Sequence, residues 1–186
     1  MLRHIPNVLT GLRLAAAPAT AGLLTTGHFD AALSVFAFAG VSDAADGFLA
    51  KRFGLTSQLG RFLDPAADKA LMLAAFLSLT LLGVVPLWLT VLIVAREGLM
   101  LLGILAAIAA RVPITLRPLL IGKVGMALQV LYVAEHLASL AFGFDLGRIE
   151  PGDALVLSGF TFLSVFAYGW VWLAAVRALR EGAAGH

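Results

Sequence analysis

Residues 43–68 read DAADGFLAKRFGLTSQLGRFLDPAAD, and this stretch decides the interpretation of the whole chain. It holds two pairs of aspartates: Asp43 and Asp46 are three residues apart, and Asp64 and Asp68 are four apart. Residues at these spacings lie on one face of a helix. Two helices joined by a short connection can bring such faces together. The stretch therefore predicts a cluster of four carboxylates between two neighbouring helices.

The rest of the chain is unusually apolar. Of its 186 residues 61% are hydrophobic, with a mean hydropathy of +0.97, whereas soluble domains have about 45–50% apolar residues. The excess is spread over the full length, without a linker or an internal repeat. Because a spanning helix needs about 20 residues, there is room for roughly six. We expect an all-α integral membrane bundle of about six transmembrane helices that forms a single domain, residues 1–186.

The order of apolar runs and charges gives an expected topology. The runs cover residues 8–26, 31–50, 65–82, 87–110, 119–142 and 154–179. The polar segment 51–61 is too short to span, so we expect it along the membrane surface or in a turn. With the N-terminus in the cytosol, all 13 basic residues except Arg96 and Arg148 lie at or near the cytosolic side. Basic residues favour that side, so the four aspartates are expected at the cytosolic face.

Carboxylates at membrane depth need compensating partners. Burying a charge in a bilayer is costly, and four carboxylates in one pocket repel one another unless cations lie between them. Oxygen-only ligands suit hard cations such as Mg²⁺ or Mn²⁺. Two divalent cations would resolve the repulsion and leave open positions for a diphosphate. The chain has no cysteine, which excludes thiolate metal sites, and its small net charge of +2 gives no reason to expect a nucleic-acid partner.

Several residues of this stretch also have a simpler explanation. Asp43 alone could pair with a basic neighbour. Asp64 precedes Pro65, so it could be a helix N-cap followed by proline at the first helical position. Lys51, Arg52 and Arg61 could be anchors at the membrane interface. The joint spacing of the aspartates, with small residues between the pairs, is what argues against a purely structural origin.

The whole frame resembles the motif of the CDP-alcohol phosphatidyltransferases, D-x2-D-G-x2-A-R-x8-G-x3-D-x3-D. It matches at every position except that Lys51 stands where the family usually has arginine, and Arg52 follows directly. A lysine binds as a point charge rather than as a planar two-pronged donor. The expected six-span topology extends the resemblance over nearly the whole chain.

This resemblance implies an activity and a set of roles. Members of the family move a phosphatidyl or similar group from a CDP-linked donor to an alcohol and release CMP. By similarity, the four aspartates hold two divalent cations, and Asp68 is also the general base for the attacking hydroxyl. The cytidine nucleotide is expected to bind at Gly47, Ala50, Lys51 and Gly60. The resemblance also implies a homodimer in a bacterial inner (or organellar inner) membrane, with the active site on the cytosolic side.

Six further polar residues are candidates for binding the acceptor or its phosphate: Asn7, Thr10, Arg13, Arg96, Arg117 and Lys123. Thr10 could instead be a hydroxyl that begins a helix, and Arg117 and Lys123 could be interfacial anchors. Arg96 and Glu97 are adjacent, so on a helix they should point in different directions and each should need a partner from another span. The alternative for Arg96 is a buried structural ion pair.

The acceptor alcohol is suggested by resemblance within the family. Residues 5–13, IPNVLTGLR, resemble the opening of phosphatidylglycerophosphate synthases and of cardiolipin synthases. Residues 98–103, GLMLLG, lack the second charged pair usual in the former, and an apolar wall suits an acceptor with acyl chains. We therefore favour CDP-diacylglycerol plus phosphatidylglycerol giving cardiolipin plus CMP, with glycerol 3-phosphate as the alternative acceptor. A transporter with an acidic intramembrane site, or a scaffold, is the competing class of function.

Overall fold

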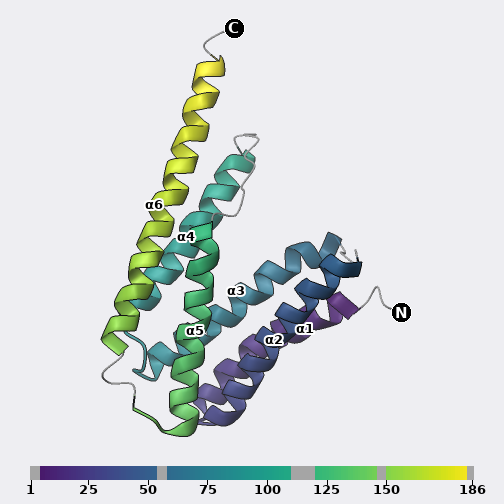
Figure 1. The fold of residues 1–186 in the computed structure, drawn as a ribbon, viewed down its shortest axis with the longest axis vertical. Coiled ribbons are helices and arrows are strands. Elements are labelled where there is room, and N and C mark those ends of the chain that lie inside the picture. Colours follow the sequence, from purple (N-terminus) through teal and green to yellow (C-terminus); the bar gives the residue numbers. More distant parts are fainter. Residues whose placement is uncertain (1–4, 54–57, 110–119, 146–149, 184–186) are drawn as a thin grey trace. The chain divides into compact units, whose positions relative to one another are not determined.

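The computed structural model describes the backbone of residues 5–53, 58–109, 120–145 and 150–183. Side chains are described for residues 10–43, 64–107, 109, 120–145 and 151–173. Over these ranges the chain is all-helical, without a strand, which confirms the predicted fold class (Figure 1). The six helices are α1 (Ile5–Thr25), α2 (Phe29–Phe53), α3 (Gln58–Leu81), α4 (Leu87–Ala109), α5 (Leu120–Phe142) and α6 (Glu150–Ala183).

Three helices end at glycines, where the sequence predicted breaks. Gly27, Gly83 and Gly143 have φ angles of 78°, 74° and 71°, a left-handed conformation that glycine adopts without a steric penalty. At the end of α1 the N–H of Gly27 donates to the carbonyl of Leu24 at 3.2 Å, and that of His28 donates to Leu23 at 2.9 Å. These bonds satisfy carbonyls that the last helical turn leaves free.

The connection between α2 and α3 is shorter than predicted. Helix α2 continues to Phe53 and α3 already begins at Gln58, so the prediction of a turn over 51–61 is wrong at both ends. The alternative, a position along the membrane surface, stays a prediction. Polar residues such as Gln and Lys are good helix formers. A prediction that follows only the apolar runs therefore leaves out the helical turns that such residues form. Pro65 lies inside α3, so the explanation of Asp64 as an N-cap before the first helical residue is also wrong.

Three of the helices are long and apolar enough to cross a membrane: Leu87–Ala107, Leu120–Phe142 and Pro151–Leu173. The chain is therefore a membrane protein. Helices α1, α2 and α3 do not meet the same criterion over their described residues, so that six helices span the bilayer stays a prediction.

The chain forms two compact units, residues 1–87 with 130–148, and residues 88–129 with 149–186. Helix α5 contributes residues to both. A single domain over the whole chain stays a prediction.

In the first unit α1 packs against both α2 and α3 (Figure 1). Its buried face repeats every three or four residues, as expected for a helix that packs along one stripe: Thr10, Arg13, Ala17, Thr20 and Leu24. Helix α2 buries Ala32, Phe36 and Ala39 at the same spacing, and α3 buries Ala67, Leu71, Ala75 and Leu79. Small residues dominate these stripes, which lets the helix backbones approach closely.

The part of α5 in the first unit carries a small aromatic cluster. The rings of Phe76 and Tyr132 stack with centroids 6.1 Å apart, and the rings of Tyr132 and His136 lie 4.1 Å apart. His136 is buried, and its Nδ1 hydrogen-bonds the carbonyl of Tyr132 at 2.8 Å. His136 thus packs within this unit and pairs with its own helix.

Glycines allow close contacts in the second unit. A Cβ atom at Gly103 would lie 3.0 Å from the ring of Trp172, and one at Gly122 would lie 2.7 Å from the hydroxyl oxygen of Tyr168. Both aromatic residues are on α6, so these glycines admit α6 side chains against α4 and α5.

Candidate functional site

The packing stripes of the first unit continue into charged residues at one end. On α2, Asp43 follows Ala32, Phe36 and Ala39 at helical spacing, and on α3 Asp64 and Asp68 precede Leu71 at the same spacing. Because both helices face α1, their carboxylates approach the polar end of the α1 stripe. Two helices thus deliver aspartates to one place, as the sequence predicted for Asp43, Asp64 and Asp68.

Arg13 of α1 lies among these three carboxylates. Its Nη2 is 3.0 Å from Oδ1 of Asp43, and its Nη1 is 3.1 Å from Oδ1 of Asp68 and 3.8 Å from Oδ1 of Asp64. The Arg13 side chain is 2% exposed, whereas those of Asp43, Asp64 and Asp68 are 49%, 39% and 20% exposed. A buried guanidinium thus holds three part-exposed carboxylates around one positive charge.

Thr10, one turn before Arg13, joins the same cluster. Its hydroxyl donates a hydrogen bond to Oδ1 of Asp64. Helix α1 begins at Ile5, so the alternative that Thr10 begins the helix is wrong. The site is therefore built from one face of α1 and the facing ends of two stripes (α2 and α3).

The donor chemistry fits a divalent cation. Asp43, Asp64 and Asp68 offer only oxygen atoms, which Mg²⁺ and Mn²⁺ prefer, and all three already surround one cationic group. Among the described side chains, no three His, Asp or Glu residues are grouped closely enough to hold a metal ion by themselves. The guanidinium of Arg13 lies between the three carboxylates. A divalent cation on the same oxygen atoms would compete with Arg13.

Several predicted site residues lie outside the described side chains. Asp46, Gly47, Ala50, Lys51 and Gly60 belong to α2 and α3, and Asn7 belongs to α1, but nothing further is described for them. Arg117 lies outside the described residues altogether. Lys123 is exposed on α5.

Arg96 lies in the second unit. Its Nε and Nη2 donate to Oγ of Ser164 on α6 at 3.1 and 3.0 Å, and its Nη1 pairs with Glu97. The expectation that the adjacent Arg96 and Glu97 would point apart and not pair with each other is therefore wrong, because the long arginine side chain reaches its neighbour. The expected partner from another helix is confirmed as Ser164.

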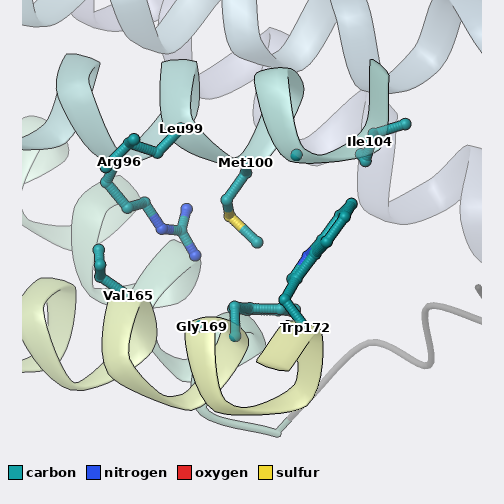
Figure 2. Close-up of a pocket in the computed structure, with 9 residues that line it drawn as sticks. Arg96, Leu99, Met100, Ile104, Val165, Gly169 and Trp172 are labelled. Atoms are coloured by element: carbon teal, nitrogen blue, oxygen red, sulfur yellow. The ribbon is translucent and has the colours of Figure 1, made fainter. Parts of the chain in front are cut away.

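A cavity of about 250 Å³ lies beside Arg96 between α4 and α6. Figure 2 shows the guanidinium pointing into this space, with Met100 and Trp172 further along. The lining also includes Leu99 and Ile104. Three residues of the apolar stretch 98–103 thus line the cavity: Leu99, Met100 and Gly103. The geometry is compatible both with a structural ion pair and with a binding pocket.

Two contacts were not predicted from the sequence. Nothing in the sequence marked Ser164 by itself as a partner of Arg96. It belongs, however, to a buried stripe on α6 at helical spacing, with Leu157 and Thr161. The partnership of Arg13 with the aspartates was visible in principle, because Arg13 continues the stripe of Ala17, Thr20 and Leu24.

Comparison with known proteins decides the family. The sequence pattern of the CDP-alcohol phosphatidyltransferase family matches residues 3–150. The chain belongs to this family. The match covers all of α1 to α5 and the complete aspartate frame, so the family resemblance of the motif is confirmed.

The chain is also similar to several curated proteins. A rat protein named cardiolipin synthase (CMP-forming) is 33% identical over 156 residues, which cover 75% of this chain and 52% of the rat protein. A Streptomyces coelicolor protein of the same name is 44% identical over 103 residues, covering 52% of this chain and 48% of that protein. A Mycobacterium tuberculosis protein named "Probable phosphatidylglycerophosphate synthase" is 40% identical over 102 residues, covering 52% of this chain and 49% of that protein. The chain thus spans about half the length of these relatives.

Proposed function

We propose that this chain is an enzyme that transfers a phosphatidyl group from CDP-diacylglycerol to phosphatidylglycerol, producing cardiolipin and CMP. The observation that carries the proposal is that Asp43, Asp64 and Asp68 meet around the guanidinium of Arg13. They do so where α1, α2 and α3 pack together, in a membrane protein of this family. The names of the rat and Streptomyces relatives support the choice of product.

The reaction needs one bond exchange at phosphorus. A hydroxyl oxygen of phosphatidylglycerol attacks the phosphorus that carries diacylglycerol, and the bond from that phosphorus to the oxygen of CMP breaks. CMP leaves with the electron pair of the broken bond, and the hydroxyl proton passes to a carboxylate of the enzyme. We assign this carboxylate to Asp68, the least exposed of the three described aspartates, since a positioned base accelerates such a step by removing the proton as the new bond forms.

The other residues of the cluster bind and orient. Asp43, Asp46, Asp64 and Asp68 hold two divalent cations, Mg²⁺ or Mn²⁺, which when bound neutralise the diphosphate and stabilise CMP as leaving group. Thr10 orients Asp64 through its hydrogen bond. Arg13 holds Asp43 and Asp68 together in the absence of cations. With cations on those oxygen atoms its guanidinium would instead pair with phosphate oxygens, for which arginine is well suited.

The nucleotide and acceptor sites complete the proposal. Gly47, Ala50, Lys51 and Gly60 line the cytidine site. Asn7, Arg96, Arg117 and Lys123 contribute to binding the acceptor phosphate.

A second acceptor, glycerol 3-phosphate, is favoured by the Mycobacterium tuberculosis relative. Against it stands the wall of Leu99, Met100 and Ile104 beside Arg96, which suits acyl chains better than a small polar alcohol. A transporter is less consistent with the family, whose members transfer a phosphatidyl group.

The setting of the enzyme follows from the charges and the family. The chain lies in a bacterial inner (or organellar inner) membrane, with the N-terminus and active site on the cytosolic side, where basic residues gather. It works as a homodimer, which small residues on the helix surfaces would accommodate.

Supplying CDP-diacylglycerol and Mg²⁺ to the purified protein, with one radiolabelled acceptor at a time, tests the proposal. The acceptors are phosphatidylglycerol, glycerol 3-phosphate, serine and inositol phosphate. Labelled cardiolipin from phosphatidylglycerol alone supports the proposal. Labelled phosphatidylglycerophosphate instead of cardiolipin would move the enzyme to the second acceptor, and no labelled lipid in any reaction would remove the activity altogether.

A further inference from the structure

A second cavity lies in the first unit, along the outer side of α1 and α2. Its volume is about 380 Å³, within the range of about 300–1,000 Å³ that is typical of ligand pockets. Small side chains leave the space: Ala15, Ala16 and Ala19 on α1, and Ala39 and Ser42 on α2. We call this space, with its walls Leu12 and Phe38, the α1–α2 groove.

The groove has one polar end. Arg13 and Ser42 line it there, and the same Arg13 side chain forms the ion pairs with Asp43 and Asp68. The groove is therefore continuous with the aspartate cluster through a shared residue. At a helical rise of 1.5 Å per residue, the six residues from Arg13 to Ala19 carry it about 9 Å away from the cluster.

Away from Arg13 the groove is apolar and accessible. Leu12 and Phe38 are 50% and 62% exposed, so the groove opens outward rather than into the core. The hydroxyl of Ser34, at the far end, already donates to the carbonyl of Asp30 at 2.8 Å and makes no demand on a ligand. An apolar trough that opens from a membrane protein and runs from a charged cluster matches the shape and polarity of a lipid chain below its headgroup.

We propose that the α1–α2 groove holds one acyl chain of the CDP-linked lipid whose diphosphate lies at the aspartate cluster. This inference rests on the proposed function, because it takes the donor to be CDP-diacylglycerol. The groove binds the first part of one chain by van der Waals contact with Ala15, Ala19 and Phe38. Its role is to fix the direction from which the lipid's phosphorus reaches the carboxylates.

The occupant is tied to the headgroup site by continuity. In a bilayer, lipid tails solvate any apolar surface equally well, so an apolar groove alone selects no particular lipid. The link through Arg13 makes occupancy depend on the diphosphate. A lipid with the same chains but a choline headgroup should therefore enter the groove far less readily.

A photo-crosslinking experiment tests the proposal. The probe is CDP-diacylglycerol with a diazirine in the first half of one acyl chain, added to the full chain in detergent with Mg²⁺. Mass spectrometry of the peptides locates the crosslinks. We expect them within residues 12–19 and 35–42, reduced by excess unlabelled CDP-diacylglycerol and not by phosphatidylcholine of the same chains.

Matched variants sharpen the test. Ala19→Leu fills the groove at a site on the exposed side of α1, and Ala15→Leu does so one turn earlier, so either can serve if the other folds poorly. Gly159→Leu on α6 is the control, because a Cβ atom at Gly159 would meet nothing within 4 Å and the residue does not line the groove. We expect a several-fold loss of groove crosslinks in Ala19→Leu and Ala15→Leu and no loss in Gly159→Leu.

The outcomes separate this inference from the proposed function. Three results would overturn the groove assignment even if the enzyme releases CMP. The crosslinks could lie elsewhere on the chain, they could persist in both leucine variants, or excess phosphatidylcholine could reduce them. Groove crosslinks with the expected competition in a protein that releases no CMP with any acceptor would keep the groove and overturn the proposed reaction.

Discussion

Arg13 is the residue on which the arrangement of the acidic cluster depends. Oxygen atoms of three carboxylates lie within 3.8 Å of the guanidinium nitrogens of Arg13. The carboxylates would repel one another without it, and Arg13 supplies the single positive charge that offsets this repulsion. Its own burial would be costly without them. Arg13 and the three aspartates therefore stabilise one another: the buried guanidinium needs the carboxylates, and the carboxylates need its charge.

Replacing Arg13 by glutamine should destabilise the protein when divalent cations are chelated. Removing one partner of a fully buried ion pair costs about 3–5 kcal/mol. Because the aspartates remain in contact with water, we expect roughly 2 kcal/mol in this case. Added Mn²⁺ should reduce the difference in melting temperature between Arg13→Gln and wild type, since it neutralises the same carboxylate oxygen atoms. Thermal unfolding with chelator and with Mn²⁺ measures both effects, and equal melting temperatures in chelator would contradict the account of Arg13.

Asp68→Asn should abolish turnover while largely preserving donor binding. The amide keeps the size of the carboxyl group but cannot accept the hydroxyl proton, and general-base catalysis is typically worth about 10²–10⁴ in rate. The measurement is CMP release at saturating lipid, alongside binding of CDP-diacylglycerol. Asp153→Asn, outside the aspartate frame, is the matched control. Turnover at the wild-type rate in Asp68→Asn would exclude Asp68 as the base.

At the residue scale the sequence predicted the aspartates better than their partners. Asp43, Asp64 and Asp68 were identifiable because their spacing is unusual and polar residues are costly in an apolar chain. That Arg13 and Thr10 meet them depends on which face of α1 turns towards α2 and α3, a tertiary property. The stripe of Thr10, Arg13 and Ala17 contained that information only once α1 was known to pack between two helices.

Helix α1 has two faces with different tasks. One face, including Ala17 and Thr20, is buried against α2 and α3. The other carries Ala15 and Ala19, which are exposed and line the groove. The same small residue type thus serves close packing on one side and an open trough on the other.

Leucine at two alanines of α1 should therefore have unequal effects on stability. Ala17→Leu adds bulk to a tightly packed helix contact, and overpacking typically costs about 1–3 kcal/mol. Ala19→Leu points away from that contact and should leave the melting temperature close to wild type. Thermal unfolding of the two variants compares them directly. If both the Ala17→Leu and the Ala19→Leu variant melt at the wild-type temperature, the buried stripe of α1 is misassigned.

The contact between α4 and α6 carries a prediction about the acceptor. The guanidinium of Arg96 has five N–H groups, and three are engaged with Ser164 and Glu97. If the remaining donors bind the acceptor phosphate, as proposed above, Arg96→Ala should raise the KM for the acceptor by roughly tenfold, the value of one charge-assisted hydrogen bond. The KM for the donor should change less.

Ser164→Ala is the control for this contact. It removes the α6 partner but keeps the charge, so it should lower thermal stability without a matching rise in the acceptor KM. An Arg96→Ala enzyme that loses stability while both KM values stay unchanged would show that Arg96 is a structural ion pair only.

At the element scale the helices were predictable and some of their ends were not. The breaks predicted after residues 26, 82 and 142 were correct, because Gly27, Gly83 and Gly143 each adopt a left-handed conformation that ends a helix locally. The ends of α2 and α3 were misplaced because the predicted spans followed apolarity. Polar residues such as Gln58 prefer water to a bilayer, but their backbone can still be helical. A span predicted from apolarity therefore ends before the helix does.

The topology of the whole molecule can be tested because the chain has no cysteine. Single cysteines at His28 and Asp145 are expected on the far side of the membrane, and one at Ser57 on the cytosolic side. A thiol reagent that cannot cross the inner membrane should label His28→Cys and Asp145→Cys in intact cells, and Ser57→Cys only after permeabilisation. The reverse pattern would invert the proposed orientation and remove the aspartates from the cytosolic face.

CMP release by the purified whole protein is the most direct test of the central claim, that the aspartate cluster carries metal-dependent phosphatidyl transfer. CDP-diacylglycerol and phosphatidylglycerol are supplied with Mg²⁺ and then with an excess of chelator. We predict one CMP for each cardiolipin formed, loss of both products on chelation, and recovery when Mg²⁺ is restored. CMP release that continues unchanged in chelator, or no release at any Mg²⁺ or Mn²⁺ concentration, would contradict the account.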